Sequence, residues 1–271
     1  MSDRLLFGVA VLFYAAATGY AVLLWRRGFR RDDSWCYTWL ALACVPHTAA
    51  LLARGFSLQR CPVTNLFEAV MFISWTVVVL HLVVGMWSRL RFLCAFGAPL
   101  LLMMGVFGLQ PGLDRPAPAM EWEVTRGLVS LHAGLILLSY GTFGLGAAAA
   151  MLYLAQEHDL KFHKVRALLS RLPAMERLEK VVTGSLGVGL GLLTAGLLLT
   201  VGLMREVGVA AVRGDPKVVW SAVVWVAYAA LLGLRLRHGW GPRPLAWGAL
   251  GSFAFVMLTF WGTNLMSPLH K

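Results

Sequence analysis

Eight long apolar segments constrain the fold of this chain more than any other feature. They lie at residues 5–25, 36–53, 66–86, 92–109, 128–155, 186–203, 219–234 and 245–265. A helix needs about 20 mostly apolar residues to cross the hydrocarbon core of a bilayer. No water is available there to satisfy backbone polar groups, which favours helices. The sequence therefore predicts an all-α, polytopic membrane helical bundle of about eight transmembrane helices, in a single domain over residues 1–271.

Lysine and arginine are distributed unevenly among the connecting loops. Most of the 24 fall in four alternate loops, at 26–35, 87–91, 156–185 and 235–244. Loops rich in positive charge stay on the cytoplasmic side of a membrane. We therefore expect the N-terminus, the C-terminus and the loops at 54–65, 110–127 and 204–218 to face outward. The expected location is the cell inner (plasma) membrane, as a multi-pass protein.

The net charge of +11 follows mainly from this loop bias and from attraction to anionic membrane lipid. No basic stripe is interleaved with exposed aromatic residues, so no nucleic-acid partner is predicted. The four cysteines form no Cys-x-x-Cys motif, which argues against thiol–disulfide exchange, and no Cys-x-x-Cys-His motif, which argues against covalently attached haem.

Two further patterns concern packing. Glycines at 141 and 144, and at 187 and 191, are spaced for close helix contact, and we interpret them as packing positions. Apolar and basic residues alternate with helical spacing at 168–182, which predicts an amphipathic helix lying on the inner leaflet and broken near Pro173.

The candidate chemical residues begin with two histidines at predicted outer ends of apolar segments. His132 lies about one turn inside the fifth segment, and His270 follows the eighth. Between them in sequence lies the polar loop Gly214-Asp215-Pro216-Lys217. An imidazole at a membrane surface is suited to bind a metal or haem iron, whereas the alternatives are an interhelical hydrogen bond for His132 and a frayed tail for His270.

Three other side chains are candidates with simpler explanations. His47 is either a ligand, or a group that guides a polar cofactor, or a partner in an interhelical hydrogen bond. Glu68 lies in the first turn of a predicted helix, where the helix dipole stabilises an acid and where Thr64 or Asn65 could cap the turn. Its alternative is to support His132 or an outer cofactor. Trp220 is an aromatic residue near the predicted outer surface, where tryptophan is common in any membrane protein.

Three stretches taken together resemble one family. Residues 62–68 read Pro-Val-Thr-Asn-Leu-Phe-Glu, which is similar to a signature of CcsA-type cytochrome c assembly proteins. The segment from His132 to Tyr140 resembles their first outer histidine helix. The loop at 214–217, Trp220, and residues 251–270 ending Asn-Leu-Met-Ser-Pro-Leu-His resemble their last two helices and terminal histidine.

The resemblance implies a haem-handling membrane protein of cytochrome c biogenesis, similar to system II, that holds or presents haem on the outer face. His132 and His270 would be the axial ligands of a non-covalent, b-type haem, with Asp215 as the acidic residue of the loop and with Trp220, Glu68 and His47 in supporting places. The implied partners are apocytochrome c and a CcsB-type protein. The chain has no independent catalytic motif, and an enzymatic role would be that of a subunit in a haem-attachment complex.

Three positions depart from the family pattern. Residues 207–213 contain no tryptophan, Val218 stands where an acid usually follows the lysine, and Gly233 stands where assembly members have an intramembrane histidine. These departures keep open a second hypothesis, a HemX-like membrane regulator or scaffold of haem biosynthesis with a vestigial outer haem site. A small-molecule transporter is disfavoured because the chain lacks convincing repeats and intramembrane charged pairs.

Overall fold

The computed structural model describes residues 2–26, 34–58, 61–63, 65–86, 88–114, 123–161, 174–207 and 216–266. In chain order the elements are α1 (Asp3–Arg26), α2 (Ser34–Leu58), α3 (Leu66–Gly85), the 3₁₀ helix η1 (Ser88–Leu93), α4 (Cys94–Gly108), α5 (Glu123–Lys161), α6 (Met175–Val207), α8 (Pro216–His238) and α9 (Pro242–Met266). Within these ranges there is no β-strand, so the predicted all-α class is confirmed.

Seven of the described helices are long and apolar enough to cross a membrane, which confirms the polytopic bundle. They are α1, α2, α3, α4 with the end of η1, α5, α6 and α8. The eighth predicted segment, 245–265, lies within the 25 residues of α9. The 39 residues of α5 extend about 58 Å at 1.5 Å per residue, well beyond a hydrocarbon core of about 30 Å.

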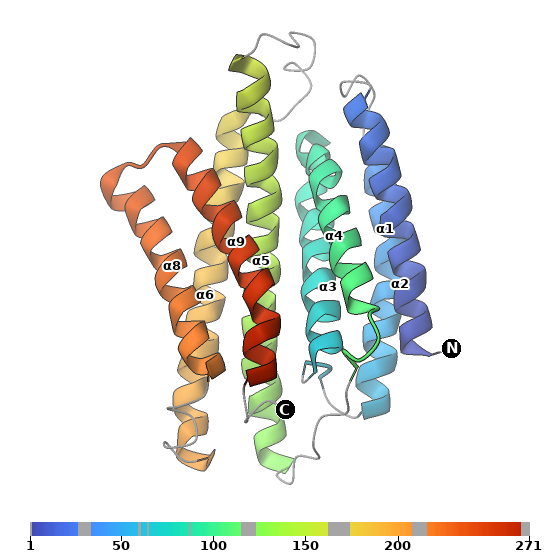
Figure 1. The fold of residues 1–271 in the computed structure, drawn as a ribbon, viewed down its shortest axis with the longest axis vertical. Helices are drawn as coiled ribbons and strands as arrows, with labels where there is room; N and C mark the ends of the chain where they lie inside the picture. The colour runs from blue at the N-terminus through green and yellow to red at the C-terminus, as the bar shows by residue number, and fades with distance from the viewer. Residues whose placement is uncertain are drawn as a thin grey trace.

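The helices run alternately in opposite directions, so the connections fall at two ends of the bundle (Figure 1). At one end, lower in Figure 1 and called the lower end below, α1, α3, α5 and α8 begin and α2, α4, α6 and α9 end. The opposite end is called the upper end. The described helix ends that adjoin the termini and the loops predicted to face outward lie at the lower end. Which side of the membrane it faces stays a prediction.

The bundle has two halves joined through α3 and α5. Helices α1 to α4 form one half, α5, α6, α8 and α9 form the other, and α3 lies beside α5 at the junction (Figure 1). A Cβ added at Gly144 of α5 would lie 2.9 Å from Val77 of α3 and 3.2 Å from Phe253 of α9. The missing side chain lets three helices approach closely. The packing interpretation is confirmed for Gly141 and Gly144.

Two predictions about α6 are wrong. No atom lies within 4 Å of the position that a Cβ would take at Gly187 or Gly191, so neither glycine packs against another helix in the described bundle. Residues 175–182 were expected in a separate surface helix but form the first turns of the continuous α6. Their amphipathic pattern has a second explanation, because Leu178 and Val182 are buried against the bundle while Lys180 is exposed. The remainder of the predicted surface helix lies outside the described residues.

Candidate functional site

His132 of α5 is held by the neighbouring helix α6. Its Nδ1 lies 2.8 Å from the carbonyl oxygen of Gly196 and 3.2 Å from the hydroxyl of Thr200. A carbonyl oxygen only accepts hydrogen bonds, so Nδ1 carries the proton and Nε2 carries the lone pair of the neutral ring. Metal-binding histidines are commonly oriented in this way, with the second ring nitrogen donating to a carbonyl. The half-buried imidazole thus has the tautomer that an iron ligand requires.

A glycine makes this arrangement possible. A Cβ at Gly196 would lie 2.8 Å from Ile136 Cγ1 and 3.5 Å from the carbonyl oxygen of His132. Without a side chain there, α6 approaches α5 closely enough for the backbone carbonyl to reach the imidazole. Sequence reasoning missed Gly196 and Thr200, although a glycine four residues before a threonine on an apolar helix is a recognisable signal for such a contact.

His270 and Asp215 lie outside the described residues, so their predicted roles stay predictions. The adjoining residues are described. Pro216 is the first residue of α8, a position where proline is favoured because its missing N–H has no helical partner. Helix α9 ends at Met266 beside the lower part of α5, the helix that carries His132 (Figure 1). Only three residues separate Met266 from His270 in the sequence.

Trp220 lies one turn into α8, at the same lower end. Its ring packs against Phe255 of α9 with centroids 4.7 Å apart and planes inclined by 48°. Its indole Nε1 is buried and has no hydrogen-bond partner among the residues that the structure describes. Trp220 thus adds an apolar surface and an unused donor between α8 and α9.

Glu68 belongs to an ion-pair cluster in the other half of the bundle. The Asn65 side chain accepts a hydrogen bond of 2.8 Å from the Glu68 backbone N–H, which confirms the predicted cap of α3. The Glu68 side chain is fully buried, and one carboxylate oxygen lies 3.0 Å from Nε of Arg54. A buried carboxylate needs such a partner, because an unpaired charge away from water is strongly unfavourable.

Arg54 is the centre of this cluster. Its Nη1 lies 3.0 Å from Asp3 and 3.2 Å from Asp114, and its Nη2 also pairs with Asp114. The guanidinium lies 5.6 Å from the centre of the Phe67 ring, within cation–π range. We call Asp3, Arg54, Glu68 and Asp114 the Arg54 network. It joins α1, α2, α3 and the segment after α4, and it gives the signature residues Asn65, Phe67 and Glu68 a structural role.

His47 is buried with both ring nitrogens engaged. Nε2 lies 3.0 Å from the Met71 carbonyl and must donate to it, so Nδ1 accepts the hydrogen bond from the Tyr14 hydroxyl at 2.7 Å. The interhelical hydrogen bond considered from sequence is therefore present, and it links α1, α2 and α3. Iron ligation by His47 would require one of these two bonds to break.

Removing the Tyr14 hydroxyl tests this buried link. We expect Tyr14→Phe to lower the free energy of unfolding by about 1–3 kcal/mol, since it leaves a buried acceptor without a partner. Thermal unfolding of the purified protein in detergent measures the change. Tyr20→Phe, on the same helix but half-exposed, is the control and should unfold like the parent chain. Equal stability of the two variants would show that the Tyr14–His47 bond contributes little.

His81 is a second buried histidine, packed against α4. Its Nδ1 lies 2.8 Å from the Val77 carbonyl, and its Nε2 has no hydrogen-bond partner among the described residues. A Cβ at Gly97 would collide with this nitrogen, so the ring fills the space beside that glycine. The contact leaves no room for a ligand between ring and helix. Within the described ranges, no three His, Cys, Asp or Glu side chains are grouped for a metal ion.

Comparisons with known proteins agree with the resemblance seen in the sequence. Residues 63–270 match the cytochrome c assembly protein family. The cytochrome c biogenesis protein CcsA of Guillardia theta is 27% identical over 250 residues, covering 85% of this chain and 82% of the relative. The CcsA proteins of Gloeobacter violaceus and Crocosphaera subtropica are each 24% identical; they cover 85% and 100% of this chain, and 84% and 95% of their own lengths.

The match extends over most of the chain and includes both candidate ligands, His132 and His270. It also includes the capped start of α3 and the helices α5 to α9. This chain is a multi-pass membrane protein and belongs to the cytochrome c assembly protein family.

Proposed function

We propose that this protein acts in cytochrome c biogenesis by holding a non-covalent, b-type haem at the lower end of the bundle, with His132 and His270 as axial ligands. The observation that carries the proposal is the hydrogen bond from His132 Nδ1 to the Gly196 carbonyl. It orients the ring and directs the lone pair to Nε2. The names of the relatives support the role in cytochrome c biogenesis.

The residues around His132 fit an iron ligand. The Gly196 carbonyl increases the basicity of the ring by accepting the hydrogen bond from its Nδ1–H, and the Thr200 hydroxyl restricts its rotation. At the same end of the bundle, Trp220 of α8 and Phe255 of α9 pack together and offer an apolar contact of the kind that a porphyrin face needs. When bound, haem would supply the vinyl groups to which thiols of apocytochrome c add. Asp215 would provide the acid of the adjacent loop.

Glu68 has a more distant place in this proposal. Its carboxylate is paired with Arg54. In this proposal it therefore supports the site indirectly, by holding the start of α3 in place. The proposed partners are apocytochrome c, a CcsB-type protein and membrane lipid, and the proposed location is the inner (plasma) membrane with the lower end outward.

Absorption spectra of the purified protein test the proposal. We expect oxidised and reduced spectra of low-spin, bis-histidine haem from the parent chain, and loss of that signal in both His132→Ala and His270→Ala. His238→Ala is the matched control, because His238 is exposed at the upper end. Imidazole added to His132→Gly should restore the low-spin spectrum, a response that a purely structural histidine would not give.

The alternative function, a membrane regulator or scaffold of haem biosynthesis, predicts a different result. A protein that purifies without haem, and whose deletion leaves c-type cytochromes at normal levels in the membrane, would overturn the proposal.

A further inference from the structure

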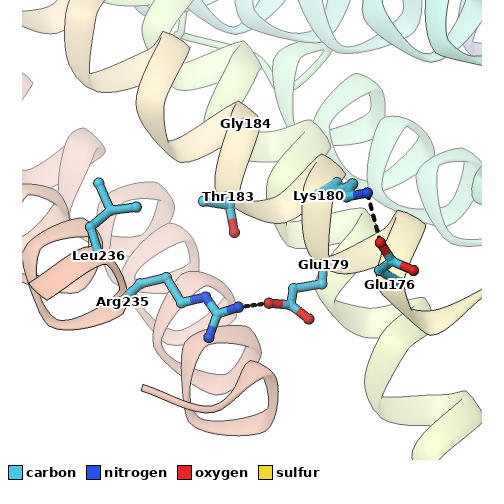
Figure 2. Close-up of a pocket in the computed structure, with 7 residues that line it drawn as sticks. All are labelled: Glu176, Glu179, Lys180, Thr183, Gly184, Arg235 and Leu236. Atoms are coloured by element: carbon cyan, nitrogen blue, oxygen red, sulfur yellow. Dashed lines mark hydrogen bonds and ion pairs between the residues drawn. The ribbon is translucent and has the colours of Figure 1, made fainter. Parts of the chain in front are cut away.

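A cavity of about 560 Å³ lies at the upper end, between the first turns of α6 and the last turns of α8 (Figure 2). Four charged side chains, together with Thr183, Gly184 and Leu236, form its wall. It is at the end of the bundle opposite to His132, so it belongs to a different site.

The charged residues of the wall are two acids and two bases. Glu179 of α6 pairs with Arg235 of α8 across the cavity, and both side chains are largely buried at 20% and 26% exposure (Figure 2). Glu176 and Lys180 form a second pair at 2.7 Å on α6, and both are about three-quarters exposed. An exposed pair of this kind contributes little to stability and exchanges partners readily. The wall therefore presents both signs of charge and no net charge.

The wall continues along α6 into an open face that carries three glycines, called the glycine face below. Gly184, Gly187 and Gly191 are spaced by three and four residues, so they lie on one face of the helix. No atom lies within 4 Å of the position that a Cβ would take at any of the three. Leu236, on the α8 side, is 70% exposed. An apolar chain can therefore lie along the helix from the charged wall toward the middle of the bundle.

The charged wall is at the level where a headgroup would be. The apolar part of α6 begins directly after Thr183, and the last apolar turns of α8 end at Arg235. Lysine and arginine at the ends of membrane helices commonly reach the headgroup region. The same end also carries Arg237 and Arg243 nearby in the chain. A ligand with a charged head and an acyl tail would match both parts of the site.

We propose that this cavity binds phosphatidylethanolamine, a phospholipid whose headgroup carries both a phosphate and a primary ammonium. Arg235 and Thr183, whose hydroxyl points into the space between the helices, would contact the phosphate (Figure 2). Lys180, whose amine is directed toward Glu176, would leave that exposed pair to reach it. Glu176 and Glu179 accept hydrogen bonds from the ammonium. One acyl chain lies over Gly184, Gly187 and Gly191. A purely anionic lipid would meet the two carboxylates, and a methylated ammonium would lack the N–H donors that they accept.

Lipid rebinding to the full-length protein tests this assignment. The protein is delipidated in mild detergent, and native mass spectrometry measures the binding of phosphatidylethanolamine, phosphatidylglycerol and phosphatidylcholine. We expect phosphatidylethanolamine to bind about tenfold more tightly than either other lipid, a difference of about 1.4 kcal/mol. Equal binding of all three would overturn the proposal.

A pair of matched variants separates the site from the general lipid surface. Gly184→Leu fills the start of the glycine face, and Gly202→Leu places the same side chain on the same helix near its other end. Both glycines have open space at the Cβ position, so neither change should disturb folding. We expect about a tenfold loss of phosphatidylethanolamine binding in the first variant only.

Lys180→Gln tests the headgroup contact separately. Because Lys180 is exposed, this change should leave the fold intact, so a loss of binding would report on the contact itself. Binding unchanged in both Gly184→Leu and Lys180→Gln would overturn the proposal. So would a helix of a copurifying subunit crosslinked at Gly187, because a protein would then cover the glycine face.

Discussion

Replacing Arg54 with methionine is expected to lower the free energy of unfolding by about 3 kcal/mol, because the change leaves the buried Glu68 carboxylate without its cation. Three carboxylates converge on this guanidinium, from α1, α3 and the segment after α4. Methionine keeps much of the length and apolar stem of arginine, so lost packing contributes little. Thermal unfolding in detergent measures the effect.

Two further variants identify its cause. Lys180→Met removes a cation from a fully surface pair and should leave unfolding unchanged. In the double variant Arg54→Met with Glu68→Gln, the buried charge is gone, and much of the lost stability should return. If Arg54→Met unfolds like the parent chain, the Arg54 network does not hold the four segments together.

Gly141→Val is the second change with a large expected effect, since it acts at the junction between the two halves of the bundle. A Cβ there would collide with the Thr76 side chain and lie 3.2 Å from the backbone carbonyl of Ile73. The nearest atoms include Thr76 Cβ, whose position is fixed by the α3 backbone, so no rotation of the Thr76 side chain relieves the clash and α3 and α5 must separate. We expect a loss of about 3 kcal/mol, at the upper end of the usual range for overpacking.

Gly134→Val on the same helix is the control. No atom lies within 4 Å of the Cβ position at Gly134, so the added methyl groups meet open space. The two variants share helix propensity and added volume, and they differ only in what the side chain meets. Thermal unfolding and limited proteolysis between the halves should distinguish them, and equal behaviour would mean that the α3–α5 contact is dispensable.

Much of the fold was predictable from the sequence because a membrane span depends on length and hydrophobicity, which are local properties. The cap of α3 was predictable for the same reason, since Asn65 and Glu68 are three residues apart. The pairing of Arg54 with Asp114 was not, because 60 residues separate them and no periodic pattern connects the end of α2 with the segment after α4.

The candidate site likewise combines a residue that the sequence predicts with contacts that it does not predict. His132 stands out in the sequence as an ionisable residue within an apolar helix. Its hydrogen bond to Gly196 depends on how α5 and α6 align along their axes, which hydrophobicity does not specify. The exposed face at Gly187 was mistaken for a packing face because glycine spacing indicates that a close approach is permitted, and does not indicate that a neighbour is present.

The Arg54 network has a consequence for the order in which the protein is made. All its members lie between residues 3 and 114, before α5 begins at Glu123. Chains are synthesised from the N-terminus, and early parts fold first. The network can therefore close before His132 leaves the ribosome. The first half would then be folded in the membrane before α5 inserts beside it and the half that carries His132 is assembled.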